Sequence, residues 1–161
     1  MKRILALLLG LSTALALCAC TGSPAASAAV DMEELQTAML EAGNFPTMRS
    51  VTGDSDKAAQ NFTYFSTLDY DKVENYLLSF SNEKTADEFA VIAVKDPADV
   101  QDAAISLSEH KDSRCNTFRQ YAPDQLDMAE KGIVFTQDQY AVLIIAENPH
   151  TIRDAFEQQL G

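Results

Sequence analysis

Residues 88–94 read EFAVIAV, a strongly β-forming segment of the chain outside its N-terminal apolar run. It is rich in β-forming residues and apolar at nearly every position, which is typical of a central strand of a sheet. In the segment before it, Tyr76, Leu78 and Phe80 alternate with their neighbours, and a period of two is typical of a strand. Residues 82–85 (NEKT) turn the chain between the two segments. The two segments therefore predict an antiparallel hairpin.

A long helix and a second hairpin follow in the chain. Asp96-Pro97 closes the strand and opens a helix, because proline fits the first helical turn. Residues 133–135 and 140–146 predict two more strands, and Asn148-Pro149 begins a last helix. The apolar stripe of the long helix, interrupted by Lys111, consists of Val100, Ala103, Ala104, Leu107, Cys115 and Phe118.

The order strand, strand, helix thus occurs twice and predicts the fold class α+β. We expect a four-stranded antiparallel sheet from two ββα units, with the helices packed on one face. An N-terminal amphipathic helix precedes it, because Asp31 is typical of an N-cap and apolar residues recur at helical spacing up to Gly43. Residues 44–69 match neither period, so their elements stay open. Residues 31–161 are long enough for one globular domain and too short for two ordinary ones.

The N-terminus is typical of a bacterial lipoprotein export signal. Lys2 and Arg3 precede a nearly unbroken apolar run, and Leu17-Cys18-Ala19-Cys20 resembles a lipobox. These features predict that residues 1–19 are a signal peptide and that Cys20 carries a lipid. Residues 20–30 are small and polar and predict a flexible tether. We expect a protein anchored to the cell membrane through Cys20, on its extracytoplasmic face.

Three alternatives to lipidation at Cys20 are weaker. Cys18 follows Leu17, which is bulkier than the small residue that the signal peptidase needs there. An uncleaved membrane span needs about 20 apolar residues, more than this run provides. A plain secretory signal cut near Ala28-Ala29 is the serious rival, although the lipobox directly follows the apolar run.

The charge of the chain limits its partners. The sequence has 12 basic and 24 acidic residues, and removal of residues 1–19 leaves 10 basic against 24 acidic, a net charge of −14. Such a surface repels nucleic acid and anionic lipid headgroups, so we expect no nucleic-acid partner. With Cys18 removed and Cys20 acylated, Cys115 has no disulfide partner, and we expect it to be a buried apolar residue.

Three segments resemble domain-of-unknown-function family 4358: residues 88–96 (EFAVIAVKD), 121–125 (YAPDQ) and 140–143 (YAVL). The resemblance extends over roughly residues 73–156. It implies a small, exported and mostly lipidated protein of low-GC Gram-positive bacteria, and it leaves the function open. On the long helix, where the resemblance leads us to expect an arginine, this chain has Glu109-His110.

No motif predicts a reaction, a metal site or a cofactor. His110 and Cys115 are five residues apart and so lie on different helix faces, which argues against a catalytic cysteine–histidine pair. We interpret His110 as a solvated helix residue. We interpret His150 as a first-turn residue of the last helix. The weak ligand-site candidates are Tyr121, Asp124 and Gln125, at a helix break. We favour a core tyrosine beside a proline-enforced bend over a site there.

These features predict a non-enzymatic binding or accessory module at the cell envelope, with a protein or small-molecule partner that the sequence does not identify. Two other classes stay open. One is an envelope hydrolase with a carboxylate acid and base. The other is an oligomerising structural lipoprotein.

Overall fold

The computed structural model describes residues 30–161. The predicted signal peptide, Cys20 and all of the predicted tether except Val30 lie outside the described residues. Among residues 30–161 no helix combines the length and the apolar character that a membrane crossing requires.

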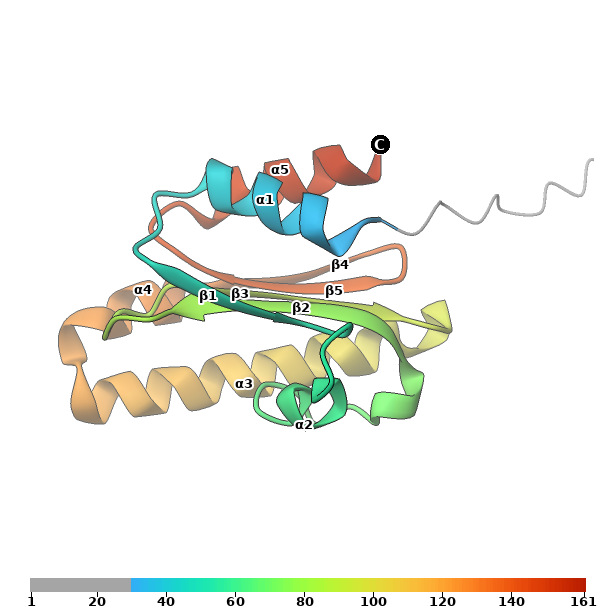
Figure 1. Cartoon of the computed structure of the whole chain (residues 1–161). Helices are drawn as coiled ribbons and strands as arrows, with labels where there is room; N and C mark the ends of the chain where they lie inside the picture. The colour runs from blue at the N-terminus through green and yellow to red at the C-terminus, as the bar shows by residue number, and fades with distance from the viewer. Residues whose placement is uncertain (1–29) are drawn as a thin grey trace, which may run out of the picture.

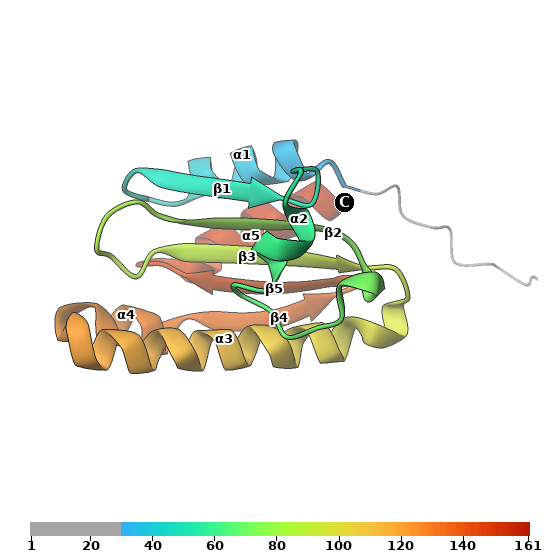
Figure 2. The same ribbon diagram turned by 60° about the horizontal axis from the view of Figure 1, so that its bottom comes forward.

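The domain is built around one antiparallel sheet of five strands, in the order β1-β2-β3-β5-β4 (Figure 2). Its regular elements are α1 (Met32–Ala42), β1 (Met48–Thr52), α2 (Ala58–Phe62), β2 (Val73–Ser81), β3 (Glu88–Val94), α3 (Val100–Tyr121), α4 (Leu126–Lys131), β4 (Ile133–Gln137), β5 (Tyr140–Ile145) and α5 (Pro149–Leu160). The α+β class is confirmed, as are both hairpins, the long helix and the first and last helices. Asp31 caps α1, since its Oδ1 accepts from the Glu33 N–H at 2.8 Å.

The prediction of four strands is wrong, because β1 pairs with β2 as a fifth strand at the edge of the sheet. Its sequence, MRSVT, lies in the stretch that matched neither period. The strand is short and only partly buried, so its side chains show no clean apolar alternation.

The prediction of helices on one face is also wrong. Figure 1 shows α1 and α5 above the sheet and α2 and α3 below it, and the short α4 packs with α3. All seven residues of β3 are buried, and a strand can be buried at consecutive positions only when both faces of its sheet are covered. Phe89 and Val91 pack with α1 and α5, whereas Ala90 and Ile92 pack with α3.

The two helical layers cover the sheet unequally. On the lower face, α3 lies against β5, β4 and β3, and the short α2 lies near β1. In Figure 2, α2 crosses one end of the β2 and β3 strands, and the other end of β1 and β2 has no helix over it. This uncovered part of the sheet forms the floor of a pocket.

Candidate functional site

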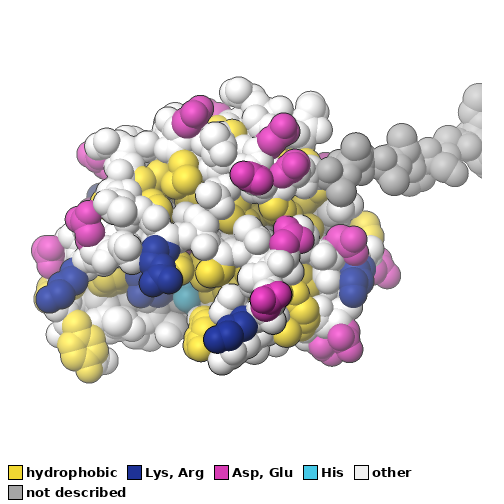
Figure 3. Space-filling view, in the orientation of Figure 1, with side chains coloured by type: hydrophobic (Ala, Val, Ile, Leu, Met, Phe, Trp, Pro, Cys, Tyr) yellow, Lys and Arg dark blue, Asp and Glu magenta, His cyan; other side chains and the backbone are white. Residues whose placement is uncertain are grey.

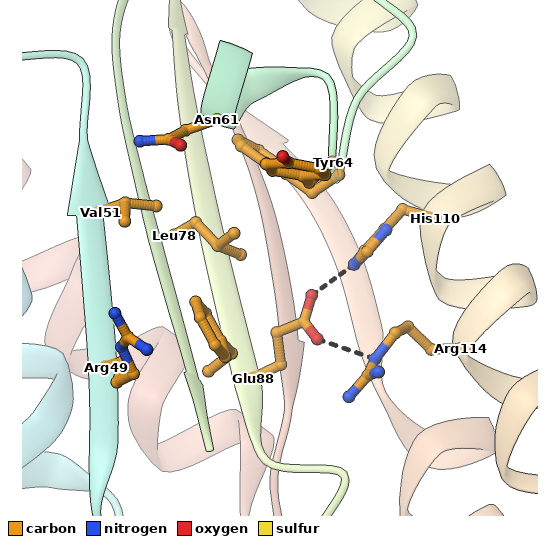
Figure 4. Close-up of a pocket in the computed structure, with 10 residues that line it drawn as sticks. Arg49, Val51, Asn61, Tyr64, Leu78, Glu88, His110 and Arg114 are labelled. Atoms are coloured by element: carbon orange, nitrogen blue, oxygen red, sulfur yellow. Dashed lines mark hydrogen bonds and ion pairs between the residues drawn. The ribbon is translucent and has the colours of Figure 1, made fainter. Parts of the chain in front are cut away.

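A pocket of about 390 Å³ lies between β1, α2 and α3 on the lower face of the sheet. Its floor and walls are mostly apolar and include Val51, Leu78 and Phe80 from the first two strands. Tyr64, just after α2, lies at one end, and the following Phe65 also lines the pocket. The polar groups are Arg49, Asn61, Glu88, His110 and Arg114 (Figure 4). A mostly apolar concavity of this size with a few polar groups is the usual form of a small-molecule site.

Glu88 is the buried centre of the polar groups. It is the first residue of β3, and its side chain is 4% exposed. His110 Nε2 contacts Oε1, and Arg114 Nε lies 2.9 Å from Oε2. His110 and Arg114 are four residues apart on α3, so they lie on the same helix face and reach the same carboxylate. A buried carboxylate needs such partners, and together the three side chains fix α3 against β3.

The guanidinium of Arg114 is incompletely satisfied by this pairing. Its Nε is buried and close to Glu88, yet it makes no hydrogen bond of good geometry within the described residues. The guanidinium also lies over the ring of Phe118, 4.6 Å from its centroid. The terminal nitrogens of Arg114 make neither a hydrogen bond nor an ion pair within the described residues, so their donors remain available beside the pocket.

Arg49 on β1 lies across the pocket from α3 (Figure 4). Within residues 30–161 it forms neither an ion pair nor a side-chain hydrogen bond. A free arginine is notable in a chain with twice as many acidic as basic residues. On the face seen in Figure 3, basic and apolar side chains gather around a histidine.

The wall formed by α2 and the residues after it is held by two buried polar contacts. The hydroxyl of Tyr76 on β2 donates to the Ala58 carbonyl oxygen at 2.8 Å, and burial raises the pKa of this tyrosine above its usual value. The Ser66 and Ser106 hydroxyls lie 2.6 Å apart, and the Thr67 N–H donates to Ser106 Oγ at 2.9 Å. These contacts connect the wall to β2 and to α3, so the pocket is preformed.

The sequence-predicted candidates lie elsewhere. Tyr121, at the end of α3, is 82% exposed, so the interpretation as a core tyrosine is wrong. Asp124 is exposed and accepts from Gln125 Nε2 at 3.1 Å. Gln125 Oε1 accepts from the Ala86 N–H at 3.1 Å, two residues before Glu88. None of the three lines the pocket around Glu88.

Of the expectations for the two histidines and Cys115, the structure contradicts one and agrees with two. His110 is not a solvated residue, since its side chain is 15% exposed and contacts Glu88. His150 is exposed in the first turn of α5, as expected. Cys115 is buried, as expected, and burial raises the pKa of its thiol.

Sequence reasoning missed Glu88, Arg114 and Arg49 as site residues. The sequence did hold a signal for two of them. Glu88 is a charged residue at the start of a strongly apolar strand. Arg114 lies four residues after His110 and four before the apolar Phe118, at helical spacing. Arg49 carried no such signal, because its strand was not predicted.

This site lies in an α+β domain with a five-stranded antiparallel sheet between two helical layers. Residues 50–146 match the family described as Domain of unknown function (DUF4358), and because the match spans more than half of the chain, the protein belongs to that family. No curated protein and no solved structure matches the chain. The matched residues include Glu88, His110 and Arg114 and exclude Arg49, α1 and α5.

Proposed function

We propose that the protein is a lipid-anchored extracytoplasmic binding module of the cell envelope, without enzymatic activity, and that its ligand occupies the pocket around Glu88. The observation that carries this proposal is the pocket itself. It combines an apolar floor with two arginines, one of which has no partner within the described residues. Such an arrangement binds and orients a ligand and needs no reacting group.

The alternative of a carboxylate hydrolase has less support at this site. A glycosidase mechanism uses two carboxyl groups on either side of the scissile bond. Among the described residues, Glu88 is the one carboxylate that lines the pocket, and both of its oxygens are engaged by cationic or hydrogen-bonding side chains. An acid and base pair would require a second carboxyl group here.

The position of the pocket is compatible with a membrane tether. The described chain begins at Val30, whose N–H donates to the Tyr140 hydroxyl at 3.3 Å, on the side of the sheet that α1 and α5 cover. The pocket is on the opposite side of the sheet, beside α3. A lipid at Cys20 would therefore be joined to the domain, at Val30, on the side of the sheet away from the pocket.

Metabolic labelling with an alkyne analogue of palmitate tests the anchor. We expect the full-length protein to incorporate the label in the membrane fraction, and the Cys20→Ser variant to lose it. The matched control is Cys18→Ser, which should remain labelled. Protease added to intact spheroplasts should digest the domain, because it lies outside the cytoplasm. Labelling that survives in Cys20→Ser, or a domain protected from protease, would contradict the proposal.

A further inference from the structure

We infer that the ligand of this pocket is a small organic carboxylate, a monoanion with an apolar body, and that Arg49 is the counter-ion of its carboxylate. This inference deepens the proposed function and rests on it. It follows from the charge, the lining and the unsatisfied donors of the pocket.

The charge of the pocket is opposite to that of the protein. Arg49 and Arg114 face one carboxylate, that of Glu88, so with His110 neutral the pocket sums to +1 in a chain whose net charge is −12. Arg49 is exposed, and a ligand that covers its guanidinium removes water from it, so a ligand that supplies a compensating negative charge is favoured. A monoanion achieves this balance, whereas a cation would increase the repulsion and a dianion would leave an excess negative charge.

The available donors place the anionic group at the β1 side. The carboxylate of Glu88 already neutralises Arg114, whereas Arg49 lacks a partner within the described residues. A guanidinium presents several donors in a planar fork, which matches the two oxygens of a carboxylate. The terminal nitrogens of Arg114, on the α3 side, can then hydrogen-bond a second polar atom of the ligand.

The rest of the lining selects an apolar body. Val51, Leu78 and Phe80, from β1 and β2, supply apolar lining. Tyr64 is 69% exposed although it is a large aromatic residue, and its ring lies at the edge of the pocket. Burial of such surface by a ligand is favourable by about 25 cal/mol per Å². A fully polar ligand, such as a free sugar, would leave this surface unused.

A matched series of three small probes tests the class of ligand. We would titrate 3-phenylpropionate, its uncharged amide and 3-phenylpropan-1-amine into the full-length protein in phosphatidylcholine nanodiscs, with empty nanodiscs as the blank, and follow saturation-transfer NMR. Inorganic phosphate serves as a competitor. We expect the carboxylate to bind at least tenfold more tightly than the amide and the amine, and phosphate at the same concentration not to displace it.

Arg49 is tested with an exposed substitution that leaves the core intact. Arg49→Gln should weaken carboxylate binding at least tenfold and should not weaken binding of the amide. Arg119→Gln, at an exposed arginine outside the pocket lining, is the control and should bind as the unaltered protein does. The inference is overturned if the amide or the amine binds as tightly as the carboxylate, if phosphate displaces it, or if Arg49→Gln has no effect.

The failure of this inference can be told from the failure of the proposed function. Binding of the amine or the amide as tightly as the carboxylate, with an NMR signal that is lost in Leu78→Trp, would overturn the carboxylate inference and retain the binding module. Absence of binding by all three probes up to 10 mM would overturn the carboxylate inference. Absence of any pocket-dependent ligand in the broader thermal screen described in the Discussion would overturn the binding function as well.

Discussion

The Nε atom of Arg114 on α3 lies 2.9 Å from Oε2 of Glu88 on β3. This contact joins the longest helix to the central hairpin at the edge of the pocket, and His110 completes it from the same helix face. The most apolar strand of the protein therefore begins with a buried charge. That charge is costly unless it is paired, so the three side chains depend on one another.

Removal of the buried carboxylate should destabilise the domain. We expect Glu88→Ala to lower the free energy of unfolding by about 3 kcal/mol, because His110 and Arg114 lose their partner in a poorly hydrated site. Urea denaturation of residues 30–161 measures this. The matched control is Glu83→Ala, an exposed glutamate in the turn before β3, which should change stability by less than about 0.5 kcal/mol. Equal effects of the two variants would show that the ion pair contributes nothing.

Apolar replacement of the whole cluster should separate folding from binding. Buried ion pairs replaced by apolar residues of similar volume are often neutral or stabilising. We therefore expect the triple variant Glu88→Met, His110→Leu, Arg114→Met to unfold within about 1 kcal/mol of the unaltered domain. When the same variant also carries Arg49→Gln it should lose ligand binding, because every charged group of the pocket is then gone. A stable quadruple variant that still binds would assign these side chains a purely structural role.

The upper helical layer should contribute to stability even though the family match excludes it. Leu35 on α1 is fully buried against the sheet. We expect Leu35→Ala to cost about 3 kcal/mol in chemical denaturation, as is usual for a large-to-small substitution in a core. Gln36→Ala, on the next residue of the helix, should cost far less. If both variants unfold at the same urea concentration, α1 does not pack as described.

The raised pKa of Tyr76 predicts a loss of stability in alkali. The unfolded tyrosine ionises near pH 10, whereas in the folded domain burial keeps the hydroxyl protonated to higher pH. Its stabilising contribution is complete below about pH 10 and is lost as the pH rises through the folded pKa. Tyr76→Phe should therefore unfold with a weaker pH dependence above pH 10. A pH profile unchanged by this substitution would contradict the burial of the hydroxyl.

The thiol of Cys115 should be unreactive in the folded domain. Burial raises its pKa and thereby lowers the fraction of reactive thiolate. With an aromatic disulfide reagent at pH 8, residues 30–161 should react at less than about a tenth of the rate seen in denaturant. Fast labelling of the native protein would show that α3 exposes this face.

The sequence predicted most elements of the fold because their signals are local. Asp31 caps α1, Asp96-Pro97 opens the long helix, and the buried strands are apolar runs, so each follows from neighbouring residues. The strand β1 was not predictable in this way, since it is defined by its pairing with β2 and by a Ser50–Ser79 hydroxyl contact of 2.9 Å.

The site was less predictable than the fold for the same reason. Glu88 and Arg114 are far apart in the sequence, and only the packing of α3 on β3 brings them together. Residues 88–94 are apolar at nearly every position, and such a run indicates that both faces of the sheet are covered, as they are in the structure. The expectation of helices on one face overlooked this indication. Glu88 and Arg114 are charged residues within strongly apolar patterns, and such residues indicate a buried polar site. This was the strongest indication of the site that the sequence analysis did not use.

The decisive experiment is a thermal-shift screen that compares the unaltered domain with the triple variant that also carries Arg49→Gln. The panel would contain carboxylates, amines, sugars, nucleotides, divalent cations and peptidoglycan fragments. A compound at a hundred times its dissociation constant adds about 2.7 kcal/mol of stability. We predict that carboxylates with an apolar body stabilise the unaltered domain and leave the quadruple variant unshifted. No shift with any compound, or equal shifts in both proteins, would contradict a binding function for the pocket around Glu88.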